Sequence, residues 1–279
     1  MRENNVLISE SVLLYKGKCE DVMPELDKVD VVITSPPYNI GKDYSSYKDN
    51  LKYTEYLEWT DVWVSLVKDV IKDNGSFFLN VGSKPSDPYT AFDVLNVCRR
   101  YFKLQNTIHW IKSIYLENII GENGKEIVIG HFKPINSDRF INDLHEFIFH
   151  FTKFGNVTID RLSLGAPYKH PSNFTRWKGK KGKTRCRGNI WYIPYKTVVS
   201  KKIHPAQFPP ELAENCIKLA GYNENTVVLD PFNGVGNTGI SCVNLGCKYI
   251  GIDIDEVYLK HTIKNIELTR KNNLQPKIP

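Results

Sequence analysis

Two short segments of this 279-residue chain carry residue types that could do chemistry. The first is TSPPY, residues 34–38, in which two prolines stiffen the backbone beside hydroxyl groups, so that a carbonyl can point outward. The second is VVLDPFNGVGNTG, residues 227–239, in which Asp230 ends an apolar run and Gly234 and Gly236 follow in a turn. Glycines let the backbone approach a ligand closely, and a helix that begins there offers free N–H groups. We expect substrate contacts at the first segment and ligand binding at the second.

A second acidic residue indicates the kind of ligand. About twenty residues after the glycine turn, the run YIGID ends in Asp253, where a carboxylate can hold the two hydroxyls of a ribose. Asp230 would repel a pyrophosphate but suits a cation, and S-adenosylmethionine carries an ammonium and a sulfonium group. The G-x-x-x-x-G-K-[ST] motif of an NTPase P-loop is absent from the sequence. The pattern therefore favours S-adenosylmethionine as the cofactor.

The elements that must position these segments alternate between strand and helix patterns. Such alternation predicts an α/β fold with a mostly parallel sheet. Residues 113–143 have no clear period and are expected to form an irregular excursion, and residues 272–279 a frayed tail. The expected strands are 12–15, 29–34, 77–81, 105–111, 146–153, 226–230 and 249–253, and the expected helices are 53–72, 87–101, 210–220, 238–245 and 256–270.

One segment holds an unusual share of the charge. The whole chain carries 37 basic and 31 acidic residues, a net charge of +6, and residues 169–187 contain eight basic residues and no acidic one. These eight account for more than the entire excess. A lysine-rich run is either a solvated loop or a surface for nucleic acid. The eight are Lys169, Arg176, Lys178, Lys180, Lys181, Lys183, Arg185 and Arg187.

The composition excludes several classes of protein. With 41% hydrophobic and 24% charged residues, the chain is typical of a soluble globular protein. Its six cysteines form no CxxC pair and no Cys/His cluster at zinc spacing, so we expect a reducing cytosol and neither a metal site nor a disulfide framework. No apolar run approaches the roughly 18 residues of a membrane span, and the first residues do not follow the pattern of a secretory signal.

Taken together, TSPPY and DPFNGVG resemble the amino-methyltransferases of DNA, whose signature is (Asp/Asn/Ser)-Pro-Pro-(Tyr/Phe/Trp). Three further segments are similar to parts of that family: HEFIFHFTK at 145–153, GNIWYIP at 188–194 and HPAQFP at 204–209. The catalytic motif precedes the cofactor motif, as in the family's permuted β class. The resemblance covers the chain except for 113–143 and the basic segment. It departs from the family at Lys18, where Gly-Asp is usual after Gly17, and at Asn237, where Thr is common.

The resemblance implies a Rossmann-like fold of the S-adenosylmethionine-dependent methyltransferases, with a doubly wound, mostly parallel sheet and circularly permuted motif order. It divides the chain into a catalytic half (1–154), a target-recognition region (155–190) and a cofactor-binding half (191–279). Only one helix is expected after Asp253, so the strand beside 249–253 must come from elsewhere, and 12–15 can supply it. The loop 17–21 would then border the adenine of the cofactor.

The resemblance also implies roles for individual residues. Ser35 and the Pro36 carbonyl would bind the edge and exocyclic amine of a base, Pro37 would stiffen the loop, and Tyr38 would stack on the base once it is flipped out of the duplex. DNA would be bound by the arginines and lysines of the basic segment from Arg176 to Arg187. The expected cofactor contacts are Asp21, Phe208, Pro209, Asp230, Pro231, Phe232, Gly234, Gly236, Asn237, Thr238 and Asp253.

The expected activity is methylation of the N4 amine of cytosine in duplex DNA, because Ser35 stands where adenine enzymes more often have Asp and HPAQFP points the same way. Methylation of adenine N6 is the main alternative. Carbon methylation would need a cysteine nucleophile, and the Pro-Cys pair that such enzymes use is absent from the sequence. A non-catalytic DNA-binding regulator and a methyltransferase of RNA or protein glutamine are further alternatives. A restriction endonuclease and a second copy of the chain are expected partners, in a bacterial or archaeal cytosol.

Overall fold

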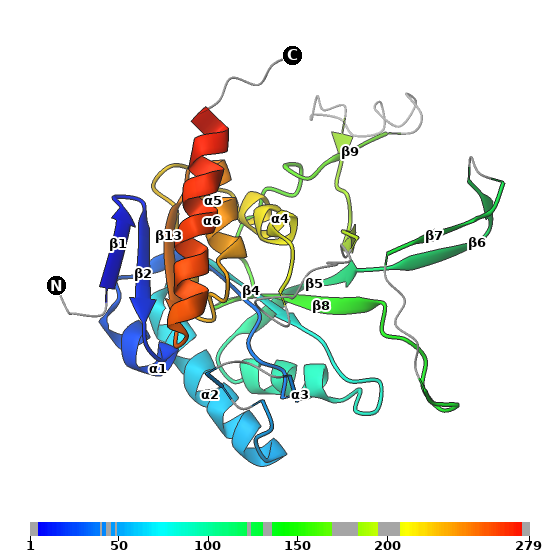
Figure 1. Cartoon of the computed structure of the whole chain (residues 1–279), viewed down its shortest axis with the longest axis horizontal. Coiled ribbons are helices and arrows are strands. Elements are labelled where there is room, and N and C mark those ends of the chain that lie inside the picture. The colour runs from blue at the N-terminus through cyan, green and yellow to red at the C-terminus, as the bar shows by residue number, and fades with distance from the viewer. Residues whose placement is uncertain are drawn as a thin grey trace.

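The computed structural model describes residues 5–39, 41–42, 46–47, 49–121, 124–130, 136–168, 184–194 and 207–274. In this part of the chain a nine-stranded sheet runs in the order β1-β2-β13-β12-β3-β4-β8-β5-β11 (Figure 1). The strands are β1 Asn5–Ser9, β2 Val12–Lys16, β3 Val29–Thr34, β4 Ile71–Val81, β5 Lys103–Ile111, β8 His145–Thr152, β11 Ile190–Tyr192, β12 Val227–Asp230 and β13 Lys248–Asp253.

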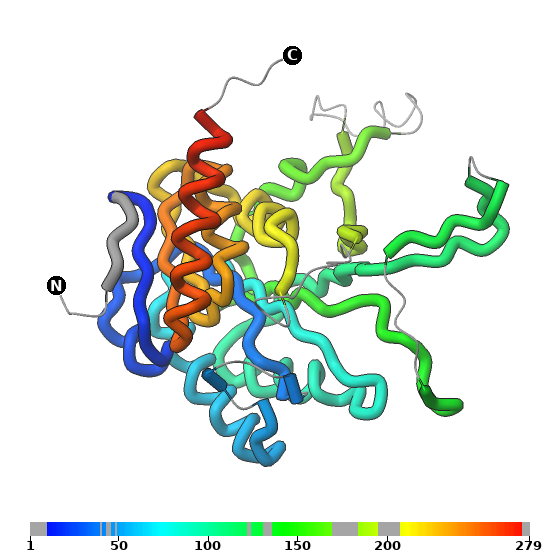
Figure 2. Tube along the Cα trace, viewed as in Figure 1, coloured from blue at the N-terminus to red at the C-terminus, as the bar shows by residue number. Residues whose placement is uncertain are grey.

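The strands from β2 to β4 are parallel to one another, as the sequence predicts. Strand β8 is antiparallel to both of its neighbours, β4 and β5. The expected placement of the strand from residue 12 is confirmed, since β2 pairs with β13 from Val12 beside Tyr249 to Lys16 beside Asp253. Strand β2, near the amino terminus, therefore lies beside β13 in the carboxyl-terminal part of the chain (Figure 2).

Helices cover both faces of the sheet, and each face has its own hydrophobic core. On one face α4, α5 and α6 pack against side chains such as Val31 and Ile33 of β3. On the other, α1, α2 and α3 pack against Val32 of β3 and Phe77 of β4. Side chains of successive strand residues point to opposite faces, and this alternation builds both cores from the same strands. The helices are α1 Cys19–Val22, α2 Tyr53–Val70, α3 Thr90–Cys98, α4 Pro210–Ala220, α5 Asn237–Leu245 and α6 Glu256–Leu274, and a 3-10 turn spans Met23–Glu25.

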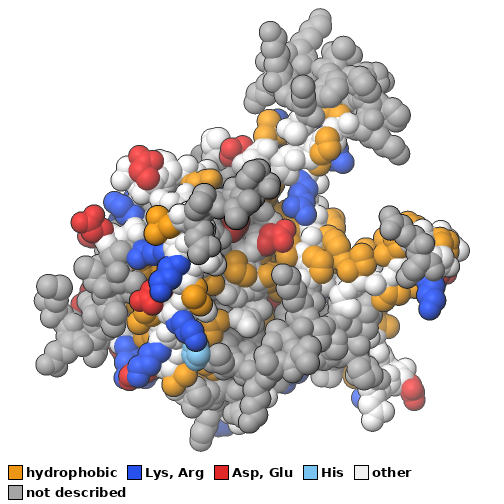
Figure 3. Space-filling view, turned by 45° about the horizontal axis from the view of Figure 1, so that its top comes forward, with side chains coloured by type: hydrophobic (Ala, Val, Ile, Leu, Met, Phe, Trp, Pro, Cys, Tyr) orange, Lys and Arg blue, Asp and Glu red, His pale blue; other side chains and the backbone are white. Residues whose placement is uncertain are grey.

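Two regions differ from the expectation. The stretch 113–143, expected to be irregular, contains an antiparallel hairpin of β6 (Ile114–Ile120) and β7 (Glu126–Ile129). This hairpin projects from the body and exposes side chains such as Ile120 and Val128 (Figures 1 and 3). Because neither of its faces is buried in the core, its sequence shows no clear alternation of apolar and polar residues. The last helix also continues into the expected tail, as far as Leu274.

The strand order reverses between β3 and β12. From β12 the chain passes through α5 to β13 on one side, whereas from β3 it passes through α2 to β4 on the other. Ligands of open α/β sheets bind beyond the carboxyl ends of the strands at such a switch point. The segments TSPPY and DPFNGVG both begin at this place.

Candidate active site

A buried carboxylate joins the two strands at the switch point. Asp230 is 2% exposed, and it accepts hydrogen bonds from the Thr34 hydroxyl (2.8 Å), the Thr238 hydroxyl (2.7 Å) and the Phe232 N–H (3.1 Å). Burial raises the pKa of Asp230 to about 6, while these hydrogen bonds lower it. The side chain thus ties β12 to β3 and to α5. Asp230 does not line the neighbouring cavity, so its position does not support the expected contact with the cofactor.

A cavity of about 380 Å³ lies next to Asp230, lined by the two residues that follow it. Ser35 and Pro37 line it from the β3 side, and Pro231, Phe232 and Asp253 line it from the β12 and β13 side. Two residues of the expected substrate motif and three of the expected cofactor residues therefore share one space, whereas Pro36 and Tyr38 do not line it. The other lining residues are Gly17, Lys18, Cys19, Glu20, Ser46, Tyr47, Trp59, Ile254, Asp255 and Tyr258.

Asp253 is one of the three carboxylates that line the cavity. One of its oxygens accepts the Gly234 N–H at 2.7 Å and the other accepts the Asp255 N–H at 2.9 Å. Partial burial raises the pKa of Asp253 to about 7, and these two backbone hydrogen bonds lower it. Gly234 has a left-handed backbone conformation, with φ of 53°.

Aromatic rings and a further acid complete the cofactor side. The Phe232 ring packs edge-on against Trp59 and Trp63, with 5.4 Å between the centroids of each pair. Glu20 accepts the indole N–H of Trp59 at 2.5 Å and lines the cavity, whereas Asp21 is exposed to solvent and does not. Of these two acids Glu20 faces the cavity and Asp21 does not, because α1 begins at Cys19 and turns successive side chains about 100° apart.

The remaining residues expected at the cofactor shape the backbone and do not line the cavity. Phe208 is 8% exposed in the core, and its carbonyl accepts the Asn237 side-chain amide at 2.6 Å. Pro209 precedes α4, and the hydroxyl of Thr238 is bound to Asp230. Gly236 precedes α5 with φ of 81°, and a Cβ there would lie 2.4 Å from the Thr262 side chain. This glycine is required by the packing of α5 against α6.

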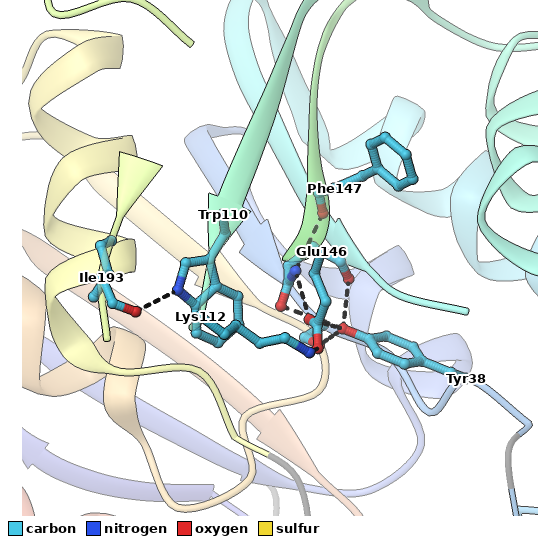
Figure 4. A network of polar contacts seen from close by, with 8 residues as sticks. Tyr38, Trp110, Lys112, Glu146, Phe147 and Ile193 are labelled. Carbon is cyan, nitrogen blue, oxygen red and sulfur yellow. Dashed lines mark hydrogen bonds and ion pairs between the residues drawn. The ribbon is translucent and has the colours of Figure 1, made fainter. Parts of the chain in front are cut away.

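The other side of the switch point carries a polar network. The Ser35 and Tyr38 hydroxyls lie 2.6 Å apart, and the Tyr38 hydroxyl lies 3.2 Å from an oxygen of Glu146 (Figure 4). Asn80 donates to the same Glu146 oxygen, and Lys112 forms an ion pair with the other oxygen at 2.9 Å. The sequence interpretation missed Asn80, Lys112 and Glu146. Asn80 and Lys112 stand at the carboxyl ends of β4 and β5, a signal that could have suggested them.

Most of the basic segment lies outside the described residues, including Lys169, Arg176, Lys178, Lys180, Lys181 and Lys183. At its two ends β9 (Ala166–Pro167) pairs antiparallel with β10 (Thr184–Arg185). Arg185 is exposed and Arg187 is partly exposed. The described residues on either side of 169–183 are therefore joined in a short ladder.

Among the described residues, no three His, Cys, Asp or Glu side chains are grouped so that they could hold a metal ion. None of the described helices combines the length and the hydropathy that crossing a membrane requires.

Comparison with known proteins decides the family. A family model described as DNA methylase, covering N6 and N4 methyltransferases, matches residues 29–265. The chain therefore belongs to the DNA methylase family. This methylase is 30% identical over 242 residues to the type II methyltransferase M.HpaI of Haemophilus parainfluenzae, a match that covers 85% of the chain and 67% of the relative. It is 26% identical over 264 residues to the DNA adenine methyltransferase YhdJ of Escherichia coli K12, covering 89% of the chain and 81% of the relative.

Solved structures show the same fold. The PvuII DNA methyltransferase (cytosine-N4-specific) superposes with a TM-score of 0.64 and 18% identity, covering 97% of this methylase and 89% of that chain. The M1.HpyAVI-SAM complex superposes with a TM-score of 0.55 and 21% identity, covering 91% of this methylase and 99% of that chain. The methylase thus has the doubly wound α/β fold of these DNA methyltransferases, with a mostly parallel sheet and the catalytic motif ahead of the cofactor motif.

Proposed function

We propose that this methylase transfers a methyl group from S-adenosylmethionine to the exocyclic N4 amine of cytosine in duplex DNA, after the base has been flipped out of the helix. The observation that carries the proposal is the shared cavity. Ser35 and Pro37 of the Pro-Pro motif line it together with Pro231, Phe232 and Asp253. A base amine and a methyl donor bound at these two walls would be held in reach of each other, which replaces a bimolecular encounter.

The donor set of the cavity fits S-adenosylmethionine. Asp253 can accept hydrogen bonds from ribose hydroxyls, and the acids Glu20 and Asp255 on the same wall favour a cationic ligand. Phe232 and Trp59 offer apolar surface for a purine ring. When bound, the cofactor supplies an activated methyl group on a sulfonium. M1.HpyAVI was solved as a complex with this cofactor, which supports the proposal.

Ser35 and the Pro36 carbonyl would act on the base. The lone pair of an exocyclic amine is delocalised into the ring, so the amine is a poor nucleophile. Hydrogen bonds from its two N–H groups to Ser35 and Pro36 would localise the lone pair toward the methyl group. The Tyr38 hydroxyl is held by Ser35 and Glu146, which fixes the orientation of the ring that would stack on the base.

The choice of cytosine over adenine rests on Ser35 in the first position of the motif and on HPAQFP. The fold of the cytosine-N4-specific PvuII enzyme is consistent with it. Adenine N6 is the second candidate, because YhdJ, which is similar over 89% of the chain, is a DNA adenine methyltransferase. Both bases present an amine beside a ring acceptor.

The test is methylation of duplex DNA with S-adenosylmethionine carrying a labelled methyl group, followed by digestion to nucleosides and mass spectrometry. We expect labelled N4-methylcytosine. Labelled N6-methyladenine alone would overturn the choice of base while leaving the reaction class intact. No label in DNA from a folded, cofactor-binding preparation would overturn the proposed function, and Ser35→Ala serves as the inactive control.

The proposed partners are DNA, a restriction endonuclease and a second copy of the chain. Residues 155–190 would recognise the DNA site, between the catalytic half 1–154 and the cofactor-binding half 191–279. A restriction endonuclease of matching specificity is proposed because M.HpaI and M.ScaI of Streptomyces caespitosus are type II methyltransferases. Protection of methylated DNA from such an endonuclease would test this pairing, and sedimentation of the purified protein would test whether it forms a homodimer.

A further inference from the structure

Glu146 occupies a defined position beside the catalytic motif. It is the second residue of β8, which enters the sheet antiparallel to β4, so its side chain lies at the edge where β4 ends. One carboxylate oxygen is paired with Lys112 at 2.9 Å, and the other accepts the Asn80 amide at 3.0 Å. The side chains of Glu146 and Lys112 are 17% and 21% exposed. The carboxylate is therefore held at both oxygens in a largely buried place.

The groups around the Tyr38 hydroxyl favour one direction for its hydrogen. Three oxygens lie 3.2 Å from it: the Asn80 carbonyl, the Asn80 side-chain oxygen and the Glu146 carboxylate. The Asn80 side-chain nitrogen is bound to Glu146 and to the Phe147 carbonyl at 3.1 Å, which leaves its oxygen turned toward Tyr38. All three are acceptors, and a carboxylate is the strongest acceptor among them. Tyr38 consequently donates its single hydrogen toward Glu146 and Asn80.

This direction determines what Ser35 can do. The two hydroxyl oxygens of Ser35 and Tyr38 are 2.6 Å apart, so one must donate to the other. Because the Tyr38 hydrogen is directed toward Glu146 and Asn80, Ser35 donates to Tyr38. The lone pairs of the Ser35 oxygen then remain for an N–H donor in the cavity that Ser35 lines. An ionised aspartate, which the family signature also allows in this position, can only accept hydrogen bonds.

We propose that Glu146 is a positioning residue that, acting through Tyr38, makes the Ser35 hydroxyl a hydrogen-bond acceptor for the amine of the target base. The inference rests on the proposed function and deepens it. Close packing supports the assignment, because a Cβ at Gly82 would lie 3.1 Å from Glu146 Cγ and 3.4 Å from Tyr38 Cε2. Gly82 thus leaves room for the two side chains to meet.

The test compares single-turnover methyl transfer by the full chain and its Glu146→Gln variant. A glutamine amide can donate to Tyr38 and so reverse the chain of hydroxyl hydrogens. We expect the transfer rate at saturating cofactor and DNA to fall about 10- to 100-fold, with the dissociation constants for S-adenosylmethionine and DNA within about twofold of the wild type. Glu146→Asp, which keeps an acceptor, should recover part of the rate. Glu214→Gln is the matched control, since Glu214 pairs with Lys218 on α4, away from the cavity.

A double-mutant cycle separates positioning from a merely structural role. Tyr38→Phe removes the hydroxyl through which Glu146 acts but leaves the ion pair with Lys112. We expect Tyr38→Phe alone to slow transfer about as much as Glu146→Gln, and Glu146→Gln to cost less than about twofold more in the Tyr38→Phe background. Because Tyr38→Phe interrupts the same chain, it keeps the inference testable should Glu146→Gln fail to fold.

The outcomes are distinct. An active wild type together with wild-type rates for Glu146→Gln or Tyr38→Phe would overturn the inference and leave the proposed function standing. An equal reduction in rate by Glu146→Gln in both backgrounds would overturn it as well. An inactive wild type would overturn the proposed function, and the inference with it.

Discussion

The polar groups on the two sides of the switch point are arranged differently. On the cofactor side, carboxylates such as Glu20 and Asp253 reach the wall of an open cavity beside aromatic rings. On the acceptor side, Asn80 is 2% exposed and Glu146 is held at both oxygens by other side chains. The first side presents acceptors to a cationic nucleoside. The second binds its polar groups to one another, so that Ser35 is presented in a fixed orientation.

Asp230 joins the two sides without belonging to either. Like Asp253, it ends a parallel strand, yet its carboxylate is saturated by Thr34, Thr238 and the Phe232 N–H. Thr34 at the end of β3 and Thr238 on α5 supply these hydroxyls, whereas each oxygen of Asp253 accepts one backbone N–H and Asp253 lines the cavity. An acidic residue at the end of a strand can therefore either bind neighbouring strands together through hydrogen bonds or contact a ligand.

The largest effect is expected on the acceptor side. Ser35→Ala removes the hydroxyl acceptor and should slow single-turnover methyl transfer about 10²- to 10³-fold, as removal of one preorganised hydrogen-bonding group at a reacting centre does. Calorimetry should show an unchanged affinity for S-adenosylmethionine. A weaker cofactor affinity in this variant would contradict the claim that Ser35 acts on the base and does not bind the cofactor.

Asp230 should govern stability. Asp230→Ala leaves Thr34 and Thr238 without their buried partner and should lower the free energy of unfolding by about 3 kcal/mol, measured by urea denaturation. Asp230→Asn keeps a side chain that can bond to both hydroxyls and should cost less. Equal stability of Asp230→Ala and the wild type would show that the hydrogen bonds of Asp230 contribute nothing to the free energy of unfolding.

The same two carboxyls predict a pH dependence of stability. Burial raises the pKa of Asp230 to about 6 and of Asp253 to about 7, so between about pH 4 and pH 7 the folded chain holds protons that the unfolded chain has released. Their contribution to the free energy of unfolding is therefore complete at low pH and declines as the pH rises through this window. In a pH series of urea denaturations, Asp230→Asn should reduce the slope; an unchanged slope would contradict the assigned pKa direction.

Asp253 should govern cofactor affinity. Asp253→Ala should weaken binding of S-adenosylmethionine about 100-fold, close to 2.7 kcal/mol. Wild-type affinity should increase as the pH rises through about 7, because ionisation makes the carboxylate a stronger acceptor, whereas Asp253→Asn should bind with little pH dependence. Calorimetry at pH 6 and pH 8 measures both. A wild-type affinity that is flat across this range would count against a direct contact with Asp253.

The smallest effect at moderate salt is expected from the basic segment. Replacing Lys178, Lys180, Lys181 and Lys183 with glutamine should weaken DNA binding about tenfold and flatten the dependence of log Kd on log salt by about 0.9 for each phosphate that the variant no longer neutralises. Cofactor affinity should not change. Fluorescence anisotropy with a labelled duplex over a salt series checks this, and an unchanged slope would reject a role in DNA binding.

The sequence predicts the parts of the molecule whose pattern is local. The buried runs and amphipathic helices are found close to their predicted places, and the pairing of β2 with β13 follows from the motif order. The exposed hairpin β6–β7 was missed because burial gives its residues no clear period. Glu20 was missed in favour of Asp21, since which of two adjacent acids faces the cavity depends on where α1 begins. Glu146 was missed because its partners Lys112 and Tyr38 are brought to it only by the sheet.

The central claim is that Asp253 binds the cofactor whereas Ser35 acts on the base. It is tested most directly by the single-turnover rate of methyl transfer to duplex DNA, measured against the concentration of S-adenosylmethionine for Ser35→Ala and Asp253→Ala. We predict that Asp253→Ala needs far more cofactor for half-saturation but approaches the wild-type plateau. Ser35→Ala should half-saturate where the wild type does and reach a plateau at least about 100-fold lower. If the plateau fell equally in both variants, or if Ser35→Ala shifted the half-saturation as far as Asp253→Ala, this claim would be wrong.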